Sequence, residues 1–408
     1  MDIRVLFVFV FLTLQLTACG QPDRASAVLP GTSDTCGGAA ITNRYIVHYA
    51  SGQWDYVHSE DREIFKEKYV RPRVDQIDFI EYDQIVRVEA SAQFYPANGI
   101  DNWGVKAIEA PRAWLAGARG KDIVVAVVDT GVDASHPQLS QRIAYNPGES
   151  GANANNGVDD DGNGYVDDYA GYNFFSSSGD TMDDVNHGTH VAGIIAAQHS
   201  DTDWAVGYTQ GVVPEAKILP VKFLGPNGGS LSAALQGIDY ALQRNAKVIN
   251  ASWGGIGCSK SLRQKVTEAS NKNVLFVAAA GNSGNNLDLY PEYPAAFQLP
   301  LQITVGSIRE SLFMDAYSNY SNTLVHLFAP GTAVVSTVPG GGYASFSGTS
   351  MATPFVAGAA AVLLARKPTL TLSEVRNALL RSTSADPSYS NVTHGRLNLG
   401  AAVDALGQ

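Results

Sequence analysis

The sequence predicts an α/β protein in which helices cover both faces of a doubly wound, mostly parallel sheet. From residue 120 onward, short apolar runs alternate with longer helical stretches, which is the pattern of repeated strand–helix–strand units. The apolar runs are almost continuously hydrophobic, as expected for strands that are buried on both faces. We expect strands at Ile123–Val128, Lys217–Val221, Val248–Ala251, Val274–Ala280 and Ile303–Val305.

The helical stretches follow these strands or lie between them, and the composition supports a packed domain. We expect helices at His187–Ala197, Leu231–Arg244, Leu262–Lys272, Thr349–Arg366 and Ser373–Ser382. In a chain of 408 residues, 45% hydrophobic and 16% charged residues are enough for a sizeable core. The net charge of −11 argues against a general nucleic-acid binder, because phosphate contacts need clustered Lys and Arg.

Residues 1–18 are predicted to be an export signal. Arg4 precedes an apolar run at 5–14 that is too short to span a bilayer permanently. The segment 16–19, Leu-Thr-Ala-Cys, resembles the lipobox of bacterial lipoproteins. This resemblance implies that Cys19 carries a lipid and anchors the protein to a membrane surface, with the outer membrane favoured. The alternatives are an ordinary signal peptide beside a chance cysteine, and secretion after processing.

Three segments are expected after the signal: a tether at 19–40, a small α+β unit at 41–95 and the large domain at 96–408. The tether contains Pro and Gly and shows no apolar periodicity. The α+β unit is marginal for independent stability because of its size. In it we expect a strand, a charged helix and two paired strands, at Arg44–Tyr49, Glu60–Tyr69, Ile77–Tyr82 and Ile85–Glu89.

Three motifs contain the residue types of nucleophilic catalysis, in the chain order Asp, His, Ser. Asp129 ends an apolar strand before a Thr-Gly turn, although strand-end aspartates are often only turn formers. His187 opens a helix in the sequence NHGTHVAG, where Gly188 leaves room beside the imidazole. Ser350 lies in SFSGTSMATP at a helix N-terminus, where backbone N–H groups favour developing negative charge; an ordinary N-cap is the alternative.

Other known motifs do not fit these segments. HGTH lacks the glutamate and the spacing of the HExxH zinc motif. The serine segment is not a GxSxG elbow, because Ala352 replaces the second glycine, and Pro354 is expected in the first turn of its helix. His190 is predicted to be a structural histidine, and His136 and His199 are predicted to lie on the surface.

Together the three motifs resemble those of the subtilisin-like serine peptidases (subtilases), and the similarity extends over roughly residues 100–405. The resemblance implies that Ser350 is the nucleophile, His187 the general base and then acid, and Asp129 the orienting carboxylate. A serine hydroxyl needs an imidazole to accept its proton, and the carboxylate stabilises the resulting cation. Asn282, in VAAAGNS, resembles the amide that binds the oxyanion.

Substrate contacts are also implied by the resemblance. Gly228-Gly229-Ser230 and Ser252-Trp253-Gly254 resemble the two segments that hold an extended peptide by strand addition. Ala279 and Gly281 would line the specificity pocket, and Leu289 would lie near its floor. The expected pocket accepts small or medium apolar side chains.

An acidic loop between the first two motifs resembles the start of an EF-hand calcium loop. Its oxygen ligands occupy alternate positions, and Gly164 supplies the turn. The bidentate glutamate at loop position twelve is missing, because Ala170 stands there; a solvated acidic loop is the alternative. The expected Ca²⁺ ligands are Asp159, Asp161, Asn163, the Tyr165 carbonyl and Asp167 or Asp168. We expect no organic cofactor.

The unit at 41–95 resembles a peptidase propeptide, which implies an inhibitor of the chain's own active site, or alternatively a permanent extension. Cys36 and Cys258 would form a disulfide only if their geometry allows it. The alternative functions are a catalytically silent subtilase-like module that binds peptides, and an esterase.

Overall fold

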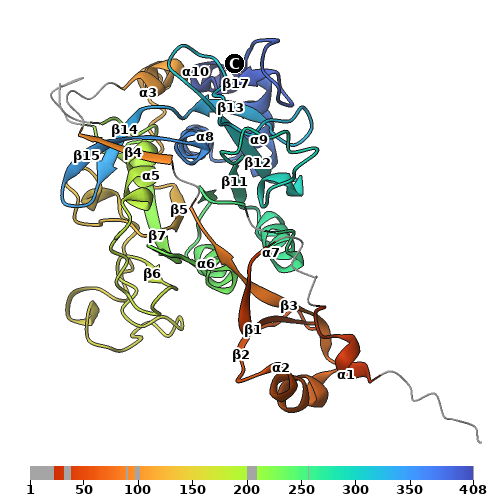
Figure 1. The fold of residues 1–408 in the computed structure, drawn as a ribbon. Coiled ribbons are helices and arrows are strands. Elements are labelled where there is room, and N and C mark those ends of the chain that lie inside the picture. The colour runs from red at the N-terminus through yellow and green to blue at the C-terminus, as the bar shows by residue number, and fades with distance from the viewer. Residues whose placement is uncertain are drawn as a thin grey trace, which may run out of the picture.

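The computed structural model describes residues 23–31, 38–88, 91–96, 102–199, 209–255 and 257–407, with only the backbone of 91–96. Its centre is a nine-stranded sheet in the order β16-β17-β13-β12-β11-β10-β5-β7-β6 (Figure 1). Adjacent strands from β13 to β6 pair in parallel, and β16 pairs antiparallel with β17 at one edge. The predicted strands are β5 (Val124–Asp129), β7 (Lys217–Lys222), β10 (Val248–Ala251), β11 (Leu275–Ala279) and β12 (Gln302–Ile308).

Side chains of the central strands alternate between two hydrophobic layers. Val125 and Val127 of β5 pack into a cluster with residues of α5 and α8, whereas Ala126 and Val128 join a cluster with residues of α6 and α7. Helices therefore cover both faces of the sheet, which confirms the predicted doubly wound α/β class. Their bounds are α5 (His187–Ala196), α6 (Leu231–Gln243), α7 (Lys260–Asn271) and α8 (Thr349–Arg366).

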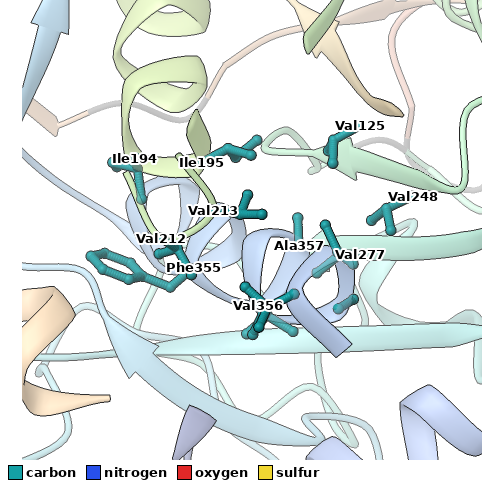
Figure 2. Packing of buried hydrophobic residues seen from close by; sticks show 14 of the residues in the cluster. Val125, Ile194, Ile195, Val212, Val213, Val248, Val277, Phe355, Val356 and Ala357 are labelled. Atoms are coloured by element: carbon teal, nitrogen blue, oxygen red, sulfur yellow. The ribbon is translucent and has the colours of Figure 1, made fainter. Parts of the chain in front are cut away.

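Helix α8 runs through the middle of the larger cluster. Figure 2 shows Phe355, Val356 and Ala357 of this helix among side chains of the strands and of α5. Among the described residues, α8 alone is long and apolar enough to cross a membrane, but 89% of its apolar window is buried inside the protein. Pro354 lies in the second turn of α8 rather than in the first, as its position after Thr349 requires.

Several elements of the large domain were not predicted, and most of them are short or lie near the ends of the chain. The additional strands are β4 (Ser91–Pro96), β6 (Tyr172–Asn173), β8 (Leu224–Gly225), β9 (Gly228–Ser230), β13 (Leu327–Pro330), β14 (Val334–Val338), β15 (Gly342–Ser347), β16 (Ser384–Ala385) and β17 (Gly395–Arg396). The additional helices are α3 (Trp103–Ala107), α4 (Ala110–Leu115), α10 (Leu399–Gly407) and the short 3-10 helices η3 (Ser140–Arg142), η4 (Gly151–Asn153) and η5 (Ala295–Phe297). The helix predicted at 373–382 is α9 (Leu372–Arg381).

The N-terminal unit packs a short helical segment against antiparallel strands and has its own hydrophobic cluster. The stacked rings of Tyr45 and Phe65, with centroids 3.8 Å apart, lie in that cluster. The prediction of two paired strands between 77 and 89 is wrong, because β3 is one continuous strand that pairs with β1. The elements are α1 (Arg24–Ala27), β1 (Ala40–Tyr49), β2 (Trp54–His58), α2 (Arg62–Ile64), η1 (Phe65–Val70), η2 (Arg71–Arg73) and β3 (Ile77–Val86).

Strand β3 joins the two units by extending a sheet into the large domain. The five-stranded order β2-β1-β3-β9-β8 contains three strands of the N-terminal unit and two of the large domain. The buried Asp83 accepts hydrogen bonds from the backbone N–H (2.9 Å) and hydroxyl (2.6 Å) of Ser232, at the start of α6. Glu81 accepts a hydrogen bond from the backbone N–H of Ser261 at 2.9 Å, at the start of α7. Two carboxylates of the N-terminal unit therefore lie at two helix N-termini of the large domain, where negative charge is favoured.

Candidate active site

The three predicted catalytic side chains lie at the ends of elements on one side of the sheet. Asp129 is the last residue of β5, His187 is the first residue of α5, and Ser350 is the second residue of α8. All three are buried, with exposed fractions of 0%, 2% and 2%. Asp129 Oδ1 accepts a hydrogen bond from His187 Nδ1 at 2.7 Å, although 58 residues separate them in the sequence.

The Asp129–His187 pair fixes the state of the imidazole. Because the carboxylate only accepts, the Nδ1 atom of His187 carries a proton, and the buried Nε2 atom has no partner among the described residues. Burial alone would lower the pKa of His187, but the charge of Asp129 and the hydrogen bond to it outweigh burial and raise that pKa. The neutral ring therefore offers Nε2 as a base, and the protonated ring is stabilised by Asp129.

Close backbone packing holds this pair in place. A Cβ atom added to Gly188 would lie only 2.1 Å from the carbonyl oxygen of Gly131, so no larger residue fits after His187. Thr130 connects the loop after β5 with the loop before α5. Its hydroxyl donates to Asp183 (2.9 Å) and accepts from the N–H of Gly188 (2.8 Å). The small residue in the HGT motif thus allows the loop after β5 to touch the start of α5.

Ser350 is held by reciprocal hydrogen bonds with Ser252. The Ser350 hydroxyl donates to the backbone carbonyl of Ser252 at 3.0 Å, and the Ser252 hydroxyl donates to the Ser350 carbonyl at 2.8 Å. The Ser350 carbonyl is available for this because Pro354, four residues later, has no N–H to donate. In this state the Ser350 hydroxyl donates to a carbonyl rather than to His187.

Asn282 follows β11 and is oriented by the start of α8. Its side-chain oxygen accepts hydrogen bonds from the backbone N–H (2.8 Å) and the hydroxyl (3.1 Å) of Thr349. A Cβ atom added to Gly348 would lie 3.5 Å from Asn282 Nδ2. The amide NH₂ group is therefore next to the turn that carries Ser350, as an oxyanion donor requires.

The chain's own N-terminal segment lies between the two predicted peptide-binding segments. Val86 pairs with Gly229 of β9, and Arg87 forms an antiparallel bridge with Gly254. Arg87 and Val88 line a cavity of 340 Å³ together with His187. An extended strand of this protein thus lies between the two segments that were predicted to hold an extended peptide.

The predicted peptide-binding residues contribute mainly backbone. A Cβ atom on Gly229 would lie 2.0 Å from the Phe223 carbonyl oxygen, so this position must be small. The indole of Trp253 is buried in the core and donates from Nε1 to the Val128 carbonyl at 2.8 Å. The Ser230 hydroxyl caps α6 by accepting from the N–H of Ala233.

The expected floor of the specificity pocket is not where the sequence analysis put it. Leu289 has 70% of its surface exposed, which does not fit a residue at the closed end of a pocket. Ala279 is buried at the end of β11, and Gly281 follows it with a left-handed φ of 102°. The side chains nearest to Gly281 are instead those of Glu292 and Asn319, whose Oε2 and Nδ2 atoms would lie 2.2 Å and 2.3 Å from a Cβ added to that glycine.

In the acidic loop, Asp159 and Asp161 come together with Glu149, a residue that the sequence analysis missed. One oxygen from each carboxylate lies within 4.8 Å of the others, which fits oxygens that share one divalent cation at about 2.3–2.6 Å. Glu149 is fully buried, and its Oε2 atom has no hydrogen-bond partner among the described residues. Such an isolated buried carboxylate oxygen is expected to bind a cation.

The other expected ligands have different contacts. Asp168 is fully buried and accepts from Arg244 (2.9 Å) and from the hydroxyl of Tyr240 (2.7 Å), so it forms an internal ion pair rather than a metal ligand. Asp167 accepts from backbone N–H groups near Asn156. The Asn163 amide nitrogen donates to Asp168, and its oxygen accepts from the backbone N–H of Tyr165. Asn163 and the Tyr165 carbonyl stay predicted ligands.

The remaining histidines have structural contacts. His190 is fully buried, its Nε2 atom lies 3.0 Å from the carbonyls of Val334 and Ala344, and burial lowers its pKa to about 3. The prediction of a structural role for His190 is confirmed. The prediction that His136 lies on the surface is wrong, because this ring is 1% exposed. His199 is half-buried and bonded to a backbone carbonyl.

Comparisons with known proteins agree with this geometry. A family model described as the subtilase family matches residues 120–399. Subtilisin J of Geobacillus stearothermophilus is 32% identical over 390 residues, covering 92% of this chain and 90% of the relative. The major intracellular serine protease of Bacillus subtilis is 38% identical over 289 residues, covering 69% and 82%. The crystal structure of a cold adapted subtilisin-like serine proteinase superposes with a TM-score of 0.56 and 31% identity, covering 69% of this chain and 89% of the other.

Proposed function

The chain belongs to the subtilase family of serine endopeptidases, and from that premise we propose that Asp129, His187 and Ser350 form its catalytic triad. The observation that carries this proposal is the buried 2.7 Å contact of Asp129 with His187 Nδ1, which leaves Nε2 as an available base. An exported enzyme of this kind would cleave proteins or peptides that bind in an extended conformation.

The proposed reaction proceeds through an acyl-enzyme intermediate. The Ser350 oxygen attacks the carbonyl carbon of the substrate while His187 Nε2 takes the hydroxyl proton. Asn282 and the Ser350 backbone N–H donate to the oxyanion that forms. The carbon–nitrogen bond then breaks as His187 returns its proton to the leaving amine, and a water molecule hydrolyses the ester by the same steps.

Ser252 links substrate binding to activation of the nucleophile. Its carbonyl, which now accepts from Ser350, belongs to a segment where we expect substrate N–H groups to bind. A substrate that donates to this carbonyl would compete with the Ser350 hydroxyl, which would then be available to His187. The Ser252 hydroxyl would keep the start of α8 fixed during that change, because it donates to the Ser350 carbonyl.

The proposal is tested by measuring the intact mass of the purified protein before and after treatment with a fluorophosphonate. Wild type should gain one probe mass, and the Ser350→Ala variant should gain none. A catalytically silent peptide-binding module would show no adduct on wild type even after removal of the N-terminal unit. An esterase would hydrolyse p-nitrophenyl esters but not peptides, whereas we expect both to be cleaved.

We propose that the N-terminal unit inhibits the site in the intact chain. Backbone pairing of Val86 with Gly229 and of Arg87 with Gly254 fills the same groups that a substrate would use. The mass spectra described above also test processing. Loss of the N-terminal unit from wild type, but not from Ser350→Ala, would mean that the enzyme removes it.

Export and anchoring remain proposals that rest on the sequence. The signal at 1–18 and the proposed lipid-bearing Cys19 lie outside the described residues, as does Cys36. Cys258 is disulfide-bonded, and a Cβ atom on Gly38 would lie 3.1 Å from the Gly257 nitrogen. This proximity supports Cys36 as the partner of Cys258. The disulfide would then keep a processed catalytic domain attached to the lipid anchor.

We propose that the acidic loop binds a structural Ca²⁺ ion through Glu149, Asp159 and Asp161. Saturating calcium should raise the melting temperature by about 3–4 °C, since a ligand at a hundred times its Kd contributes about 2.7 kcal/mol and the unfolding entropy grows with the size of the domain. The Ser350→Ala protein, which cannot digest itself, would be melted in excess calcium and in EGTA.

In the same background, Glu149→Gln should abolish most of the calcium effect. Asp160→Asn is the matched control, because Asp160 lies in the same loop but is exposed and outside the carboxylate group. Equal melting temperatures in calcium and in EGTA would contradict the proposal.

A further inference from the structure

Glu292 carries a buried carboxylate oxygen to which none of the described residues donates a hydrogen bond. Its Oε1 atom accepts from the hydroxyl of Ser283 at 2.9 Å. Its Oε2 atom is buried and has no hydrogen-bond partner, and within the described part of the chain no Lys, Arg or His lies within ion-pair distance. An ionised oxygen in this condition is costly, which makes it a group that a complementary donor would stabilise.

The Oε2 atom of Glu292 lies close to the proposed peptide-binding site. Its Oε2 atom would lie 2.2 Å from a Cβ on Gly281, the residue before Asn282. The next residue, Tyr293, has its carbonyl oxygen 3.4 Å from a Cβ on Gly254, in the segment that pairs with Arg87. The chain at Glu292–Tyr293 therefore reaches Gly281, which is expected to line the specificity pocket, and Gly254, which lies in the expected peptide-binding segment.

We propose that Glu292 forms the floor of the specificity pocket and selects Lys or Arg on the amino side of the cleaved bond. The inference deepens the proposed peptidase function and rests on it. A Lys ammonium or Arg guanidinium would donate to the unsatisfied Oε2 atom, while Ser283 holds Oε1 and thereby fixes the carboxylate. A neutral side chain in the same place would leave that oxygen buried and unpaired, so it would bind less well. This selectivity replaces the apolar preference that followed from the expected place of Leu289 at the pocket floor.

The test uses peptides that differ only at the residue before the cleaved bond: Lys, Arg, Met, Leu or Glu. On wild type, kcat/KM for Lys and Arg should exceed that for Met, which is similar in length to Lys but uncharged, by about 30-fold or more. Glu292→Gln should reduce this ratio to about threefold or less without lowering kcat/KM for Met. Glu310→Gln, which removes an exposed carboxylate, should leave the ratio unchanged.

A charge reversal separates specificity from a merely structural role. Glu292→Lys should favour the Glu peptide over the Lys peptide, which loss of folding would not produce. A wild-type enzyme that cleaves Met or Leu peptides as fast as Lys peptides would overturn the inference, as would a Lys preference that survives in Glu292→Gln. All rates are divided by the fraction of enzyme that a fluorophosphonate labels. Unlabelled wild type would mean that the proposed peptidase function has failed, whereas labelled enzyme without a basic preference would refute the role of Glu292 alone.

Discussion

Replacing Ser350 with alanine is expected to lower kcat by about 10⁶-fold, the largest effect of any substitution proposed for this protein. The variant keeps Asn282 and the binding segments but has no oxygen that can form the acyl-enzyme. Its KM should change little, because the substitution removes only the hydroxyl and leaves intact the backbone groups of 228–230 and 252–254 that we expect to hold the peptide. The rate is measured with a fluorogenic peptide on protein from which the N-terminal unit has been removed.

The control for this experiment is Ser345→Ala. Ser345 lies on β15, five residues before the nucleophile, and is half-buried. Its replacement should leave kcat within about twofold of wild type, since a partly exposed serine away from the reacting atoms has a small effect. Residual activity of Ser350→Ala above one thousandth of wild type, with no wild-type contamination by mass, would contradict the assignment.

Replacing Asp129 with asparagine is expected to lower kcat by about 10⁴-fold, because the amide no longer selects the imidazole tautomer or stabilises its cation. The pH dependence should change as well. His187 acts as a base only when it is neutral, so activity is lost as the pH falls through the pKa of this residue. In wild type, Asp129 raises that pKa despite burial. In the variant only the lowering effect of burial remains strong, so the acidic limb of kcat/KM should move to lower pH.

The matched control is Asp122→Asn, just before the amino end of the same strand. Asp122 is exposed and has a left-handed φ of 61°, a conformation that asparagine also tolerates. Its profile of kcat/KM between pH 5 and 10 should coincide with that of wild type. An Asp129→Asn variant whose acidic limb does not move would show that another group sets the pH dependence.

Local patterns in the sequence were sufficient to predict the central strands and helices and to identify Asp129, His187 and Ser350. These features depend on continuous apolar runs and on motifs of a few residues. The sequence predicted a break in strand β3 at Asp83, because aspartate is common in turns. In the structure Asp83 lies inside the strand and is buried, where it accepts hydrogen bonds from Ser232, 149 positions away.

Two expectations, Asp168 as a calcium ligand and Leu289 as the pocket floor, were wrong for the same physical reason. Asp168 fits the spacing of calcium ligands, but its charge is neutralised by Arg244, 76 residues later in the chain. Glu149 precedes the acidic loop and has no motif of its own. The proposed role of Glu292 depends on its proximity to Gly281, and no local sequence pattern shows which of several loop residues will lie beside that glycine.

If the N-terminal unit inhibits the site as we propose, the shared sheet would make that inhibition independent of dilution. The edge of β9 offers one set of backbone groups, and β3 occupies it as part of the same chain. A tethered segment competes at an effective concentration of about millimolar, however few molecules are present. Cleavage of the connecting chain would turn this into an encounter between two fragments, which weakens as the solution is diluted. A disulfide from Cys258 to the N-terminal segment would keep the two fragments covalently joined after cleavage. The site would then become free only after reduction of the disulfide and dilution.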